Sequence, residues 1–306
     1  MRALGGSARF LASWLLVVAG AFLALRLMPG DPVARLVAEM GVRPSAEVIA
    51  GYREAFGLEG SLAAQFLAWL AGFVTLDWGV SPVTGRAILP DLAARAPWSI
   101  AIGIGGLGLA TCLGFALGFR AAVRPGGLAE ATSRALAVAG QALPAFAVGL
   151  GLLWLVAVEW RLIRPFSGPP HERLLLPILL VCAFSIGSVA RLSRAAFAEV
   201  SRAPYLATAR MKGLSPRAAL WRHGRRHAAL TVLAATLPDM AWVIGGTAIA
   251  EIVFGVPGIS ERVLSAVHAR DYGVLQAYVA LVALWLLACA GAAGALRRRL
   301  DPRVAP

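Results

Sequence analysis

Two histidines four residues apart have the spacing of a metal site in this 306-residue sequence. His223 and His227 would share one face of a helix, where such a pair can bind zinc. A zinc peptidase also needs a glutamate directly after the first histidine, but that position is Gly224. Neighbouring arginines add positive charge that disfavours a further cation. We therefore predict no metal site and interpret the pair as part of a basic loop.

Other catalytic patterns are also missing from the sequence. An intramembrane protease would need paired aspartates, a serine–histidine pair or a metal-binding helix at membrane depth. Asp239 is the only aspartate clearly within a long apolar stretch, and no histidine lies in one. A phosphate loop for ATP ends in Gly-Lys and then Ser or Thr, whereas the only lysine, Lys212, follows Met211. We predict no catalytic residues, no cofactor in this chain and no enzymatic activity.

Three residues within apolar stretches are candidates for lining a translocation pathway. A carboxylate in hydrocarbon costs about 3 kcal/mol or more, so Asp239 should face a bundle interior or water. Burial as a structural partner of a hydroxyl or backbone group is the alternative. Gln141 and Pro144 are weaker candidates, because a proline frees carbonyls that a neighbour or a cavity must satisfy.

The composition indicates that these residues belong to a polytopic membrane protein. Hydrophobic residues make up 59% of the chain and charged residues 15%, with a mean hydropathy of +0.73. A soluble domain has about 25% charged residues. Its interior is too small, relative to its surface, to bury such an excess of hydrophobic residues. The same composition excludes a disordered chain.

Six apolar stretches are long enough, or nearly so, to cross a membrane core of about 30 Å. They predict an all-α protein with transmembrane helices at about 10–28, 97–119, 133–158, 174–190, 228–252 and 273–296. The first stretch exceeds the apolar core of a signal peptide, which has about 7–15 residues, so we interpret it as a span.

Charge predicts the orientation of these spans. The net charge of +13 suits arginine-rich cytoplasmic loops better than a nucleic-acid surface. The N-terminus, the loops 120–134 and 191–227 and the tail 297–306 carry 18 basic and three acidic residues. Segments 29–96, 159–173 and 253–272 carry 10 basic and 11 acidic residues. Both termini are therefore expected in the cytoplasm.

Segment 29–96 is too polar to be a span and too long to be a simple loop. Pro29, Gly30 and Pro32 should end the first helix. Residues 45–70 are expected to be helical with Ser45 as the N-cap, and Leu76–Gly85 is rich in turns. We predict a small external domain over 29–96 and a five-helix core over 97–296.

The loop 191–227 contains nine basic residues and one acid. Pro204 should begin a short helix through Lys212, Gly213 should end it, and Ser215 with Pro216 should begin a second helix. On this pattern alone, docking of a partner protein and a purely topogenic arginine cluster remain equally supported.

At this loop the sequence resembles a known family. The run Tyr205-Leu206-Ala207-Thr208-Ala209-Arg210-Met211-Lys212-Gly213-Leu214-Ser215 is similar to the EAA loop of ABC importer permeases, and more narrowly to the dipeptide, oligopeptide and nickel permeases. Ala207 departs from that pattern, which usually has arginine there. Further matches in the same order are Pro29-Gly30-Asp31-Pro32, Phe56-Gly57-Leu58, Leu76-Asp77-Trp78-Gly79-Val80-Ser81, Ala190-Arg191-Leu192-Ser193-Arg194-Ala195, Gly245-Gly246, Glu251, Phe254, Pro257-Gly258, Arg270-Asp271-Tyr272 and Leu300-Asp301-Pro302-Arg303.

The resemblance implies the type I importer permease fold in a bacterial inner membrane. It implies that the chain forms half of a translocation pathway and works with a second permease, two ABC ATPases that bind ATP, and an extracytoplasmic substrate-binding protein. Within the loop it implies ATPase coupling through Tyr205, Ala207, Thr208, Ala209, Arg210, Lys212, Gly213, Leu214 and Ser215.

The substrate stays open between a dipeptide, an oligopeptide, nickel and another metal chelate. The spans contain no cluster of His, Cys or Met for a bare metal ion, which mildly favours a peptide or a chelate. A channel or secondary transporter that works without ATPases is the alternative, and it leaves the loop resemblance unexplained.

Overall fold

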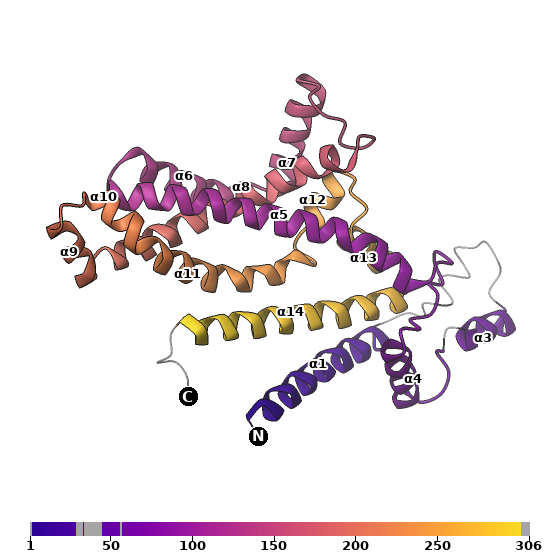
Figure 1. Cartoon of the computed structure of the whole chain (residues 1–306). Coiled ribbons are helices and arrows are strands. Elements are labelled where there is room, and N and C mark those ends of the chain that lie inside the picture. Colours follow the sequence, from indigo (N-terminus) through magenta and orange to yellow (C-terminus); the bar gives the residue numbers. More distant parts are fainter. Residues whose placement is uncertain (1, 29–32, 34–44, 56, 301–306) are drawn as a thin grey trace. The chain divides into compact units, whose positions relative to one another are not determined.

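A computed structural model describes residues 2–28, 33, 45–55 and 57–300, and within these residues all regular elements are helical apart from one isolated bridge, Val80 to Ala87 (Figure 1). The expected helix break at 29–32, Phe56 of a family match and the tail 301–306 lie outside them. The chain divides into two compact units, one of Met1–Pro97 with Ile259–Leu287 and one of Trp98–Gly258 with Ala288–Pro306.

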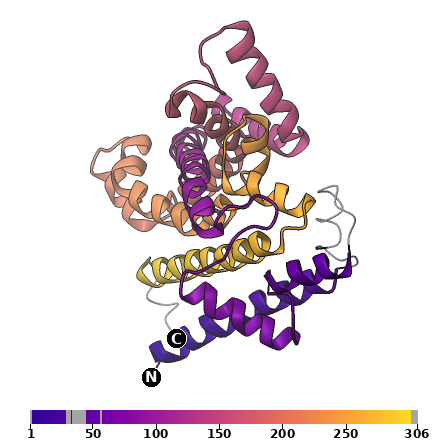
Figure 2. The same cartoon turned by 90° about the vertical axis from the view of Figure 1, so that its right-hand side faces the viewer.

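The first unit is built around helix α1. Figures 1 and 2 show α1 alongside the first part of α14, and the Trp14 indole donates a hydrogen bond to the Ala280 carbonyl at 3.0 Å. Trp14 and Val18 are buried there against Ala280 and Ala283, with aromatic side chains of α4 around them. The helices of this unit are α1 (Arg2–Arg26), α3 (Ala46–Ala55), α4 (Leu62–Val74), the first turns of α5 (Ile88–Val123), α13 (Ile259–His268) and the first part of α14 (Tyr272–Leu300).

Segment 45–70 is two helices rather than the one helical stretch that we expected. The Ser45 hydroxyl accepts a hydrogen bond from the Val48 amide at 3.2 Å, which confirms the predicted N-cap. The chain then turns at Gly57 and Gly60, where positive φ angles interrupt the helical pattern. The predicted turns over 76–85 are confirmed by positive φ angles at Leu76, Gly79 and Gly85.

A buried ion network joins the end of this segment to α13 and α14. Arg262 is 3% exposed and donates to Asp91 at 3.0 Å and to Asp271 at 3.0 Å. The Ser81 hydroxyl donates to the same Asp271 carboxylate at 2.5 Å. Burial makes charge costly unless it is paired, so these contacts fix the segment's end to the two helices.

The second unit contains the long helices that follow. Its elements are the rest of α5, α6 (Leu128–Ala142), α7 (Ala145–Leu153), a π-helical turn (Trp154–Glu159), α8 (Pro170–Val200), α9 (Pro204–Met211), α10 (Pro216–Ala219), a second π-helical turn (Leu220–Gly224), α11 (Arg225–Thr236), a 3₁₀ helix (Leu237–Val243), α12 (Ala248–Val253) and the end of α14.

Four described helices are long and apolar enough to cross a membrane: Ala8–Arg26, Ile88–Val123, Pro170–Val200 and Tyr272–Ala295. The expected third span is a pair, Leu128–Ala142 and Ala145–Glu159, bent by 105° at Pro144. The expected fifth span is not one helix either, because a 3₁₀ helix with Pro238 in its first turn follows α11, and Gly245 adopts a φ of +112° before α12. The described part of the chain therefore has four such helices, or five if the bent pair counts as one span, against the six that we expected. The protein is a multi-pass, all-α membrane protein of the predicted fold class.

Helix α8 packs closely against α6 at Gly187. A Cβ atom at this position would collide with the backbone of Ala137 in α6. Glycine is therefore required here by space, as at the close helix contacts of other membrane proteins.

We expect Gly187→Ala to destabilise the protein by about 1–3 kcal/mol, because backbone atoms must separate to admit the methyl group. Gly108→Ala in α5 is the matched control, since nothing lies within 4 Å of its added Cβ. Thermal unfolding in detergent measures both. Equal melting temperatures for the two variants would contradict the close α6–α8 contact.

Candidate functional site

The candidate site is the loop that connects α8 to α11, residues 201–224, which we call the α9–α10 loop. Pro204 is the first residue of α9, with Ala203 as its extended N-cap, as the sequence predicts. Proline suits this position because its missing N–H has no helical partner there. Helix α9 ends at Met211, so the first predicted helix is confirmed almost to its last residue.

Gly213 makes the turn between the two short helices. Its φ of +91° is a conformation that β-carbon sterics disfavour for other residues. The Gly213 and Leu214 amides donate back to the carbonyls of Arg210 and Ala209 at 2.9 and 3.3 Å, which satisfies the end of α9. The Ser215 hydroxyl then accepts from the Ala218 amide at 3.2 Å and caps α10. The predictions that Gly213 ends the first short helix and that Ser215 begins the second are confirmed.

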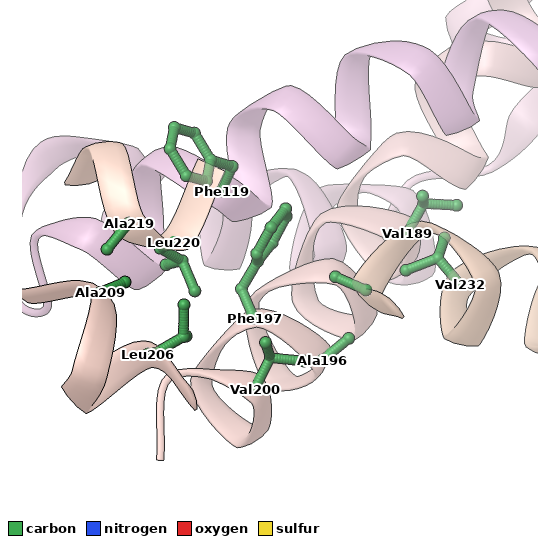
Figure 3. Close-up of a cluster of buried hydrophobic side chains, with 11 residues drawn as sticks. Phe119, Val189, Ala196, Phe197, Val200, Leu206, Ala209, Ala219, Leu220 and Val232 are labelled. Atoms are coloured by element: carbon green, nitrogen blue, oxygen red, sulfur yellow. The ribbon is translucent and has the colours of Figure 1, made fainter. Parts of the chain in front are cut away.

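The loop packs on a hydrophobic cluster at the end of α8, which we call the seat. Figure 3 shows Leu206 of α9 and Leu220 beside Phe197 and Val200 of α8. Leu206 and Phe197 are fully buried. The ring centroid of Phe119 in α5 lies 5.1 Å from the ring centroid of Phe197. Burial of such side chains stabilises the seat, so α9 is held against α5 and α8 rather than suspended in a free loop.

The opposite face of α9 is exposed and basic. Met211 is 81% exposed and Tyr205 48%, and the side chains of Arg210 and Lys212 are exposed beside them. An exposed apolar side chain among charges is typical of a surface that meets a partner protein. Of the predicted coupling residues, Tyr205, Ala207, Thr208, Arg210, Lys212, Gly213 and Ser215 are exposed, whereas Ala209 is buried and Leu214 is half-buried.

Met211 was missed as a site residue by sequence reasoning. The signal for it is the helical period, because Leu206 and Ala209 are three residues apart and face the seat, which turns Met211 outward. Beside the loop lies an open hollow of about 410 Å³, lined by Ala116, Phe119, Arg120, Ser215, Arg217, Ala218 and Trp221.

His223 and His227 are both exposed, in the second π-helical turn and in α11. Within the described part of the chain, no group of three or more His, Cys, Asp or Glu residues is placed to hold a metal ion. The expectation that the protein binds no metal stays a prediction.

Two of the pathway candidates lie at the bent pair α6 and α7, and the third lies in the interrupted segment 228–252. Gln141 is in the last turn of α6, Pro144 is the N-cap of α7 at the bend, and Asp239 is in the 3₁₀ helix. All three side chains are exposed in the single chain. The choice between a pathway role and a structural role for Asp239 stays a prediction.

A buried carboxylate that the sequence singled out only through family resemblance lies near the end of the interrupted segment 228–252. Glu251 in α12 is fully buried and accepts hydrogen bonds from the hydroxyls of Ser99 at 2.7 Å and Thr247 at 2.6 Å. A Cβ at Gly258 would collide with this carboxylate. Glu251 therefore connects α5, α12 and the turn that follows it.

We expect Leu206→Ala to loosen α9, because removing a fully buried leucine costs about 2–5 kcal/mol. Met211→Ala is the control on the exposed face of the same helix and should change stability by less than about 0.5 kcal/mol. Hydrogen exchange of the α9 amides measures both. Equal protection of the α9 amides in the two variants would contradict the claim that Leu206 holds α9 on this cluster.

The comparisons with known proteins agree with this architecture. Residues 114–306 match the family described as binding-protein-dependent transport system inner membrane component. A probable peptide ABC transporter permease protein of Sinorhizobium fredii, y4tP, is 31% identical over 269 residues, which cover 85% of each chain. The glutathione transport system permease protein GsiC of Shigella flexneri is 33% identical over 263 residues, 86% of this chain and 85% of its own. GsiC of Salmonella typhi is 33% identical over 270 residues, 88% and 87% of the two chains. This chain therefore belongs to the inner-membrane components of binding-protein-dependent transport systems, as a permease of the peptide-type ABC importers.

Proposed function

We propose that the chain forms half of the translocation pathway of an ABC importer for peptides and that partner ATPases drive it through the α9–α10 loop. The observation that carries the proposal is the geometry of this loop, whose inner face is fixed to α5 and α8 while its outer face is exposed, basic and partly apolar. A rigid seat of this kind transmits a displacement to the spans, which a flexible loop would absorb.

The coupling residues have different roles in this proposal. Tyr205, Met211 and the exposed Arg210 and Lys212 contact the ATPase, whereas Leu206 and Ala209 pass the movement to α8. ATP is bound by the partner subunits, since this sequence has no phosphate loop. The chain itself holds no cofactor and catalyses no reaction.

The cargo is proposed to be a peptide. The names of the relatives, a peptide permease and a glutathione permease, support this class over nickel or another metal chelate. Gln141 and Asp239 are proposed to line the pathway, because exposed polar groups in apolar stretches require water or a partner around them. Pro144 is proposed to line it too, because a proline frees carbonyls that a neighbour or a cavity must satisfy. A second permease of similar fold completes the pathway, and a substrate-binding protein delivers the cargo from outside.

A channel or a secondary transporter would need no ATPase. That alternative does not explain why the α9–α10 loop has a buried inner face and an exposed outer face. An ATPase-driven importer explains both, because the outer face can bind the ATPase while the inner face contacts the spans.

We expect Gly213→Val to weaken ATPase binding and ATP-driven uptake while membrane levels stay normal. Nothing lies within 4 Å of the added Cβ, so the change acts through the backbone, where the positive φ costs a β-branched residue about 1–2 kcal/mol. Gly126→Val is the matched control, with a φ of +75° and equal space in a different loop. Co-purification of the ATPases and an uptake assay measure both variants.

If Gly213→Val and Gly126→Val behaved alike, the loop would have no special part in coupling. It would then be only a topogenic arginine cluster, and importer function would rest on another ATPase contact.

We expect both termini to lie in the cytoplasm of the bacterial cell, because the more basic set of loops lies on their side. A reporter active only in the cytoplasm should work after Arg299, and a reporter active only outside should work at Gly60. Activity of the outside reporter after Arg299 would contradict this topology.

A further inference from the structure

A cavity of about 270 Å³ in the first unit has no part in the proposed transport function. It lies where α1 ends and α14 begins, with α4 and the turn 77–83 forming other parts of its wall. Arg26, Gln65, Trp69, Trp78, Tyr272 and Gln276 are among the residues that line it.

Four of these lining side chains have a buried polar atom without a hydrogen-bond partner in the described part of the chain. The atoms are Arg26 Nε, Gln65 Oε1, the Tyr272 hydroxyl oxygen and Gln276 Nε2. Tyr272 is 8% exposed and Gln276 2%. Buried polar groups in native proteins are nearly always paired, so four unpaired polar atoms around one cavity point to a polar ligand that this cavity would bind.

These unpaired atoms favour a ligand that is rich in hydrogen-bond acceptors. Arg26 Nε, the Tyr272 hydroxyl and Gln276 Nε2 all donate hydrogen bonds. The Arg26 guanidinium is held 5.0 Å from the Phe22 ring and 5.8 Å from the Tyr272 ring. Arg26 brings a positive charge to the lining beside these donors, so the cavity complements a negatively charged group that is rich in acceptors.

The position of the cavity indicates where such a group comes from. Arg26 ends one membrane-crossing helix and Tyr272 begins another, which places both at a boundary between hydrocarbon and water. Trp69, Trp78 and Tyr272 are residue types enriched at that boundary. Helix α4 is too short to cross, yet Leu67 and Val74 on its outward face are 63% and 71% exposed, as in a helix that lies in the membrane surface.

We propose that this cavity binds the headgroup of a phospholipid in the outer leaflet, with the phosphodiester near Arg26, Tyr272 and Gln276. The positive charge of Arg26, whose Nε has no hydrogen-bond partner in the described part of the chain, favours a headgroup with net negative charge, such as phosphatidylglycerol, over a zwitterionic one. The bound lipid joins α1, α4 and α14 at the membrane surface. This site is independent of which substrate the importer carries.

Native mass spectrometry of the full chain, titrated with phosphatidylglycerol and separately with phosphatidylcholine, tests the proposal. We expect phosphatidylglycerol to bind more tightly and Arg26→Gln to weaken it by about tenfold, the usual loss with a charged hydrogen-bond donor. Tyr272→Phe keeps the ring and removes only the hydroxyl, so it should weaken binding by about threefold without affecting the fold. Arg86→Gln removes an exposed arginine of the same segment outside the cavity and should leave binding unchanged.

Three results would overturn the lipid site. One is equal binding of the two lipids, and another is equal loss in Arg26→Gln and Arg86→Gln. The third is that soluble glycerol phosphate or a dipeptide displaces phosphatidylglycerol at comparable concentration, which would assign the cavity to a dissolved anion or to the cargo.

Discussion

Helix α8 approaches α5 and α6 so closely at two glycines that no Cβ atom fits there. At Gly118 in α5, an added Cβ would lie 2.5 Å from the Ala190 carbonyl oxygen, and at Gly187 it would meet the backbone of α6. In a membrane, where lipid is as apolar as the protein, such contacts between helix backbones supply packing energy that hydrophobicity cannot. The end of α8 carries Phe197 and Val200, so the same helix that is fixed by these contacts also supports α9.

The seat of α9 makes the loop part of the packed unit. Leu206 and Leu220 are buried on both sides of the Gly213 turn, and Phe119 and Phe197 close the cluster beneath them. Packed interiors transmit displacement because they resist compression. A force on the exposed face of α9 therefore acts directly on α5 and α8.

Buried carboxylates organise the places where regular helices stop. Glu251 lies beside the break before α12, and Asp271 lies just before α14. Each is fully buried and each accepts a hydroxyl hydrogen bond from a serine far away in the sequence, Ser99 and Ser81 respectively. Removing one serine hydroxyl would leave a buried carboxylate oxygen with one hydrogen bond fewer, which is costly, so these contacts help to define the local geometry.

The sequence by itself determined the membrane character, the positions of most apolar segments and the local structure of the α9–α10 loop. These features depend on composition or on neighbouring residues, as with Pro204, Gly213 and Ser215. Only the tertiary structure decided the rest. It placed Leu206 in one cluster with Phe119, brought Ser99 to the carboxylate of Glu251, and paired Arg262 with Asp91 and Asp271. Each of these outcomes depends on residues distant in the sequence, whose contacts no local pattern encodes.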